Sequence, residues 1–81
     1  SPRAAPEEAC RRLIAEGVRI APDATLETAM PLFEKGGHAF IPVVAAAAKG
    51  GEAELMGAIF QVDALKAYNR ALAATAADEH S

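Results

Sequence analysis

The sequence predicts one small domain of the α+β class, in which a small sheet packs on helices. Apolar residues recur at spacings of three and four in residues 26–33 and again in residues 65–72, as they do in amphipathic helices. Between these stretches lie two runs of apolar and β-branched residues, "HAFIPVVAA" and "ELMGAIFQV", which are too short for core helices. The length of 81 residues leaves room for a single hydrophobic core.

The composition argues against several classes of protein. The formal net charge is −3 and there is no block of lysine or arginine, which argues against a nucleic-acid-binding face. No apolar run approaches the ~20 residues that span a bilayer. The lone Cys10 cannot form an internal disulfide, so a reducing compartment fits best. A chain this short buries only about 60–65% of its unfolded surface, which leaves a role for a partner surface.

The two ends of the chain differ in composition from the middle. "SPRAAP" is typical of a linker and "AATAADEHS" of a tail without a core-facing stripe. We therefore expect residues 1–5 to be a linker or tag remnant, residues 6–74 to form the domain and residues 75–81 to form a flexible tail.

The first half of the domain predicts a helix, a strand and a second helix. After Pro6, "EEACRRLIAEG" places acidic residues early and ends at a glycine, which favours a short helix. "VRIAP" alternates apolar and polar residues and predicts a brief strand over residues 18–22.

A second helix is expected after residues 23–25, where Asp23 or Thr25 can cap it. Its apolar stripe consists of Leu26, Ala29, Met30 and Phe33. Pro31 lies roughly opposite this stripe, so we expect it to loosen the helix on the solvent side.

The second half predicts a hairpin followed by a helix. "AAAKGGEA" separates the two apolar runs and suits a loop, so the strands should pair antiparallel. Pro42 inside the first run predicts an edge position or an irregularity. "DALKAYNRALAATAAD" predicts the last helix, with Leu65, Tyr68 and Leu72 on one face and Asp63 as its cap.

These segments, in this order, resemble the CBS motif, the β-α-β-β-α unit named after cystathionine β-synthase. The resemblance covers residues 18–72 and rests on "PDATLETAM", the "IPVV" strand, and the glycine six residues before the aspartate in "GAIFQVD". The ending "DALKAYNRAL" also resembles the last CBS motif of bacterial CLC-type chloride channels. The fold that this resemblance implies is a CBS-domain-like unit preceded by an extra N-terminal helix.

The resemblance implies a regulatory module without chemistry of its own. CBS motifs pack in pairs through their sheets, and the clefts between paired motifs commonly bind adenosine nucleotides. The implied protein is a cytoplasmic regulatory and dimerisation domain of a membrane ion channel or transporter, of the chloride-channel kind. Its expected partner is a second copy, as a homodimer, or a second CBS motif of the parent chain. It would reach the membrane only through an attached transmembrane domain.

The same resemblance assigns candidate site residues. Asp63 stands where ligand-binding CBS motifs place the aspartate that holds the ribose hydroxyls. The serine or threonine that helps to hold phosphate is replaced by Phe60, which has no donor, and only His38 lies near the usual basic position. The candidate adenosine site consists of Asp63, Phe60, His38, Ile41 and Pro42, and the candidate dimer or core face consists of Phe40, Val43, Ile59, Leu65 and Tyr68.

Each of these residues also has a purely structural interpretation, and both stay open at this point. Capping of the last helix, worth about 1 kcal/mol, is the alternative to ribose contact for Asp63. His38 is either a loop residue that supports the turn into the strand or a phosphate ligand. Phe40 and Phe60 are core or dimer-face residues in one interpretation and base-stacking platforms in the other.

Nothing in the sequence predicts catalysis or a metal site, because no nucleophile, histidine and acid stand in a plausible arrangement. No cofactor is required, and ATP, AMP and adenosine are the candidate ligands. Two further hypotheses remain beside the channel regulator. One is an adenine-nucleotide-sensing CBS module of another protein, and the other is a structural dimer clamp without a ligand.

Overall fold

A computed structural model describes residues 5–46, 51 and 53–80 of the chain. Its elements are α1 (Glu7–Ala15), α2 (Leu26–Gly36), β1 (Phe40–Ala45), β2 (Glu54–Phe60) and α3 (Gln61–His80). The predicted α+β class is confirmed, with three helices and a two-stranded antiparallel sheet in the described part of the chain. Most of the predicted hairpin loop, residues 47–50 and 52, lies outside the described residues.

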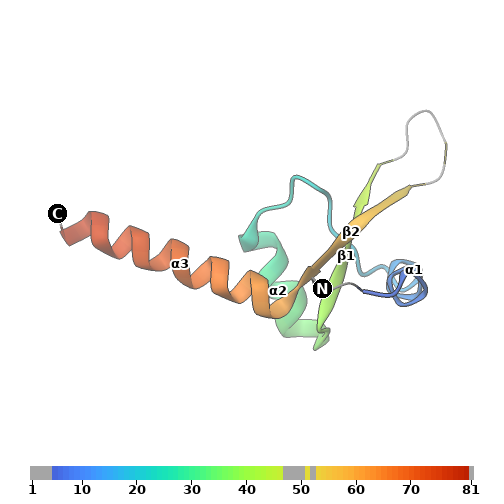
Figure 1. Ribbon diagram of the computed structural model, residues 1–81, viewed down its shortest axis with the longest axis horizontal. Coiled ribbons are helices and arrows are strands. Elements are labelled where there is room, and N and C mark those ends of the chain that lie inside the picture. The colour runs from blue at the N-terminus through green and yellow to red at the C-terminus, as the bar shows by residue number, and fades with distance from the viewer. Residues whose placement is uncertain (1–4, 47–50, 52, 81) are drawn as a thin grey trace.

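The elements form three layers, with the sheet in the middle. Figure 1 shows α1 on one side of the two strands and α2 with the start of α3 on the other. Most of α3 extends away from the rest of the molecule, which gives the chain extents of 49 × 28 × 28 Å. This helix includes residues 75–80, which the sequence analysis placed in a tail.

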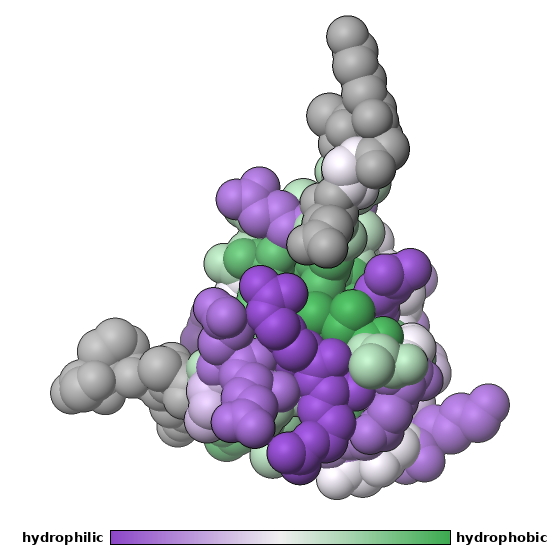
Figure 2. Space-filling view, turned by 90° about the vertical axis from the view of Figure 1, so that its right-hand side faces the viewer, coloured by the Kyte–Doolittle hydropathy of each residue, from purple (hydrophilic) through white to green (hydrophobic). Residues whose placement is uncertain are grey.

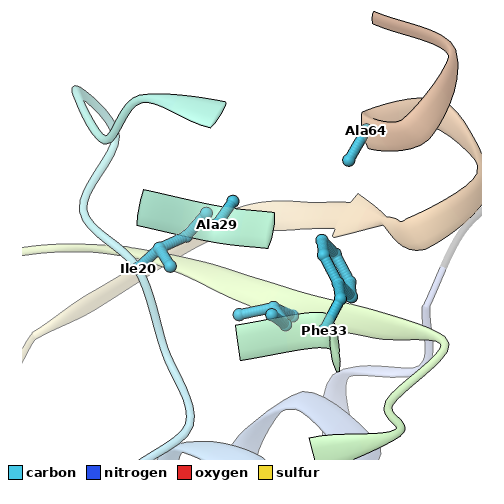
Figure 3. Packing of buried hydrophobic residues seen from close by; sticks show 5 residues of the cluster. Ile20, Ala29, Phe33 and Ala64 are labelled. Atoms are coloured by element: carbon cyan, nitrogen blue, oxygen red, sulfur yellow. The ribbon is translucent and has the colours of Figure 1, made fainter. Parts of the chain in front are cut away.

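The core lies between the sheet and the two helices α2 and α3. Its buried members are Ile20, Ala29, Phe33, Ile41 and Ala64. Figure 3 shows Phe33 and Ala64 directed toward one another from two different helices, with Ile20 and Ala29 beside them. Ile41, in the middle of the domain, has no exposed surface at all. The apolar stripe predicted for α2 is therefore the stripe that faces the core.

The ends of α2 follow from local chemistry. Thr25 caps the helix, because its Oγ1 accepts a hydrogen bond from the Thr28 backbone N–H at 3.3 Å. Gly37 ends it with φ of 66°, a left-handed conformation that glycine adopts without a steric cost. Pro31 lies inside the helix and is exposed, as expected from its position opposite the stripe.

The strand predicted over residues 18–22 is wrong, because only Ile20 pairs with the sheet. Its N–H donates to the Pro42 carbonyl at 3.1 Å and its carbonyl accepts from the Val44 N–H at 2.9 Å, which makes a parallel bridge to β1. A longer parallel ladder would need a backbone N–H from Pro42 on one side of the bridge and one from Pro22 on the other. Proline has no N–H, so neither bond can form. The two prolines therefore limit the parallel ladder to one residue.

The same bridge corrects the prediction that Pro42 marks an edge. β1 lies between Ile20 and β2, and Pro42 is fully buried there opposite Ala58. The N–H that Pro42 lacks would point toward the segment that contains Ile20. That segment turns away toward α1 just before Ile20, where the Val18 N–H donates to the Leu13 carbonyl. An irregularity does occur nearby, as a shift of register between Val43 and Val44.

The cap predicted at Asp63 is also wrong, because α3 begins two residues earlier, at Gln61. β2 therefore passes into α3 at Phe60, and Gln61 and Val62 belong to the helix rather than to the strand. The Gln61 N–H donates to the Ala39 carbonyl at 2.9 Å, so the start of β1 satisfies one of the four free donors of the helix.

Truncation of Phe33 tests the core. Phe33 is 1% exposed, so Phe33→Ala should lower the free energy of unfolding by about 3–5 kcal/mol. A domain of this length has a total of only about 4–12 kcal/mol, so the variant should be partly unfolded at 37 °C. Urea denaturation followed by circular dichroism measures the change. Glu34→Ala, at an exposed site of the same helix, is the matched control and should change stability by about 0.5 kcal/mol or less. Equal effects of the two substitutions would contradict this assignment of the core.

Candidate functional site

Two of the predicted site residues, Phe40 and Phe60, lie together at one end of the sheet. The hydrogen bond from the Gln61 N–H to the Ala39 carbonyl joins the start of β1 to the start of α3. Phe40 and Phe60 are paired across the strands there, with ring centroids 5.6 Å apart and planes inclined at 45°. His38 precedes this pair and Asp63 follows it. Phe40 and Phe60 are thus in contact, while His38 and Asp63 are their near neighbours in the sequence.

The two aromatic rings at this end stabilise one another. A tilted pair at this distance contributes about 0.5–1.5 kcal/mol beyond the area that it buries. Both rings are half-buried, on the face of the sheet that α1 occupies. They act here as a cross-strand pair, and this arrangement favours the structural interpretation of Phe40 and Phe60.

Asp63 lies in the first turn of α3, and its side chain is exposed. A negative charge there is favourable because the N-terminus of a helix carries a partial positive charge, an effect of about 0.3–1 kcal/mol. The carboxylate thus has a structural role in the helix even though it is not the cap.

His38 is half-buried and is packed on the end of α2. A Cβ atom built on Gly36 would overlap the His38 imidazole, so the ring lies directly against the glycine backbone. Because Gly36 provides the space for this ring, the position of His38 is explained by packing in the turn that leads into β1.

The remaining candidates divide between the core and the surface. Ile41 and Pro42 are fully buried, so their side chains belong to the core and are not offered to a ligand. Val43 and Ile59 are partly buried against the core. Leu65 is 46% exposed on α3, and Tyr68 is half-buried one turn further along the helix.

Open grooves also lie on the surface of the described residues. One, of about 450 Å³, runs beside the Ile20 bridge and is lined by Arg19, Ile20, Ala21, Val44, Ala45, Ala46, Gly51 and Ala53. Another, of about 420 Å³, lies between the start of α2 and the middle of α3 and is lined by Thr25, Leu26, Glu27, Tyr68, Ala71, Leu72 and Thr75. Asp63 and His38 line neither of them. Neither groove is predictable from the sequence, because each joins segments that are far apart in the chain.

A third groove, of about 280 Å³, separates α1 from β2. Its lining consists of Ala5, Glu7, Cys10, Leu55, Gly57, Ala58 and Phe60. Figure 2 shows this side of the molecule, where hydrophobic surface borders the hydrophilic residues. α1 packs on β1 and leaves the outer part of β2 uncovered, with Met56 57% exposed. The sheet is therefore only partly covered by the helices of the described chain.

Within the described residues, no group of three histidine, cysteine or acidic side chains is placed to hold a metal ion. In the same part of the chain, no helix has both the length and the apolar character needed to cross a bilayer.

Comparisons with protein-family models, with curated proteins and with solved structures found no match to this chain. The class that the geometry itself defines is a small α+β domain with a half-covered antiparallel sheet and a projecting C-terminal helix.

Cys10 is the one thiol of the sequence and lies in the groove between α1 and β2, 2% exposed. Burial, and to a smaller extent the charge of Glu7, raise the pKa of this thiol above its ordinary value of 9.0. The neutral thiol is the stable form in the folded protein, so stability is fully retained below pH 9.0 and falls as the pH rises through the folded pKa.

Because of its burial and raised pKa, Cys10 is predicted to react slowly with thiol reagents. At pH 8, a disulfide reagent should label Cys10 much more slowly in the folded chain than in the chain unfolded by urea. Glu7→Gln should speed labelling of the folded chain, because it removes the charge that disfavours the thiolate. The neighbouring Glu8→Gln is the control and should leave the rate unchanged. Equal labelling rates in the folded and unfolded chains would contradict the buried placement.

Proposed function

We propose that this chain is a regulatory and dimerisation domain of the CBS type, attached on the cytoplasmic side to a membrane ion channel or transporter of the chloride-channel kind. It acts by pairing with a second motif of the same type rather than by catalysing a reaction. The pairing partner is a second copy or a neighbouring motif of the parent chain.

The topology of the described chain supports this proposal. After α1, the order is the bridging residue Ile20, helix α2, the antiparallel pair β1 and β2, and helix α3. Ile20 is parallel to β1 and stands where a CBS motif has its first strand, reduced here to one residue by two prolines. This order and these pairing directions are the ones that a β-α-β-β-α unit would require, and they support the proposal.

The observation that carries the proposal is the uncovered part of the sheet. Met56 is 57% exposed at the β2 edge, beside the apolar lining of the groove between β2 and α1. A small monomeric domain gains little from leaving a large apolar side chain in water, whereas a paired domain buries it. A second sheet laid against β2 would cover Met56 and the half-buried Leu55 together.

Pairing gives the domain a means of regulation. If the parent protein has two states that hold its cytoplasmic domains at different separations, the pairing free energy favours the state in which these surfaces meet. A ligand of the domain would act on the parent only to the extent that it binds the paired and separated forms differently.

A charged substitution on β2 tests the proposed contact between two sheets. Met56→Glu places a carboxylate in the proposed contact and removes an apolar side chain worth about 1.5–3 kcal/mol when buried. We expect the dimer dissociation constant, measured by sedimentation equilibrium, to rise by roughly tenfold to a hundredfold. Ala74→Glu places the same charge on an exposed site of α3 and should leave the constant unchanged. A chain that stays monomeric at all concentrations, or equal constants for both variants, would reject self-pairing through β2.

The adenine-nucleotide sensor is the second candidate, favoured by the position of Asp63 in the first turn of α3. We expect calorimetric titration with ATP, AMP and adenosine at millimolar concentration to give no binding heat. The physical reason is that Phe60 offers no donor and packs on Phe40, while the His38 ring lies against Gly36. Binding heat that disappears in Asp63→Ala would favour the sensor over a domain that works without a nucleotide.

A further inference from the structure

α3 carries a row of exposed residues that the core does not use. Ala64 is the α3 residue buried in the core, and Tyr68, Ala71 and Thr75 line the groove toward α2. About a third of a turn further around the helix lie Val62, Leu65, Asn69, Leu72 and Ala76, all exposed. We call these five residues the α3 seam.

The seam residues are spaced 3, 4, 3 and 4 positions apart, which is the repeat that lets two helices pack along their length. In the heptad notation, Val62, Asn69 and Ala76 occupy a positions, and Leu65 and Leu72 occupy d positions. The apolar members are 42%, 46% and 53% exposed at Val62, Leu65 and Leu72. The middle of this helix is therefore apolar on a side where the described chain places nothing against it.

The residue types at these positions specify the partner. A β-branched residue at a combined with leucine at d favours two parallel helices over larger bundles. Asn69 has both a donor and an acceptor, and in a parallel pair it lies opposite its own copy, where the two amides can satisfy one another. An apolar partner surface would instead leave this amide without a hydrogen bond, at a cost of about 1–3 kcal/mol.

The flanks of the seam are compatible with a second copy. The e and g positions over residues 61–75 are Gln61, Lys66, Tyr68, Ala73 and Thr75, so Lys66 is the only charged residue among them. In a parallel pair, the side chain at g meets the partner's e position in the next heptad, which places Gln61 opposite Lys66 without a like-charge contact. α2 contacts the side of α3 that contains Ala64 and so leaves the seam open.

We propose that two copies of this chain associate through a parallel, in-register pairing of their α3 seams. The pairing places the two folded bodies side by side at the same end of the helix pair. The inference rests on α3 alone and does not depend on the proposed function, because the seam and the exposed part of β2 are separate surfaces.

Disulfide trapping tests both the contact and its direction. In a parallel pair, Val62 faces Val62 of the other copy and Ala76 faces Ala76, close enough for a disulfide. Val62→Cys and Ala76→Cys should each form a covalent dimer in a glutathione redox buffer. Ala74→Cys, at an exposed f position on the opposite face of the same helix, is the matched control and should form no covalent dimer. The unmodified chain, in which Cys10 is buried, should also form no covalent dimer.

The crosslinking results distinguish a parallel pair of helices from an antiparallel pair. An antiparallel pair would crosslink Val62→Cys only to Ala76→Cys in a mixture of the two, and this result would overturn the proposal. Failure to crosslink at both positions, or equal crosslinking at position 74, would overturn it as well.

A second set of variants separates the seam from the sheet. Leu65→Lys with Leu72→Lys should abolish the disulfide dimer of Val62→Cys, because like charges would replace the apolar contact. Met56→Glu in the Val62→Cys chain should leave crosslinking unchanged. Loss of crosslinking in that variant would overturn the independence of the two surfaces, whereas failure of the β2 test alone leaves the seam result standing.

Discussion

β1 is the element on which the rest of the described chain depends. One edge is bonded to β2, the other edge is bonded to Ile20, and helices cover both of its faces. Ile41 and Pro42 at its centre are fully buried as a result. A six-residue strand is thus enclosed on every side, and the other elements are each held by their contact with it or with their neighbours around it.

Enclosure of β1 leaves β2 and α3 incompletely covered, and this asymmetry follows from the short chain. α1 has nine residues and spans only the part of the sheet that lies over β1. α3 has twenty residues, of which the first turns reach the core while the rest extends past it. Exposed apolar side chains therefore collect on β2 and α3, at Met56 in the sheet and at Leu65 and Leu72 in the helix.

The sequence predicts features that local chemistry decides and fails where a distant residue decides. Thr25 as a cap, Gly37 as a stop and the α2 stripe depend on residues within a few positions of one another, and all three are present. The strand at residues 18–22 fails because Pro42, which is distant in the chain, cannot supply the second donor. The start of α3 was misplaced because Ala39 bonds to Gln61. Of the candidate site residues, Phe40 and Phe60 pair across the two strands, whereas alternation along β1 turns Ile41 into the core.

A domain of this size gains stability when its two exposed surfaces are covered. Folding of 81 residues leaves a small net free energy, and any partner that binds only the folded chain adds to it by mass action. Contacts at β2 and at the α3 seam lie on different elements, so each can be made or broken while the core around Ile41 stays intact. The regulatory role that we propose requires this separation, because the association must change without unfolding. The closed core around β1, beside the partly open β2 and α3, is compatible with that requirement.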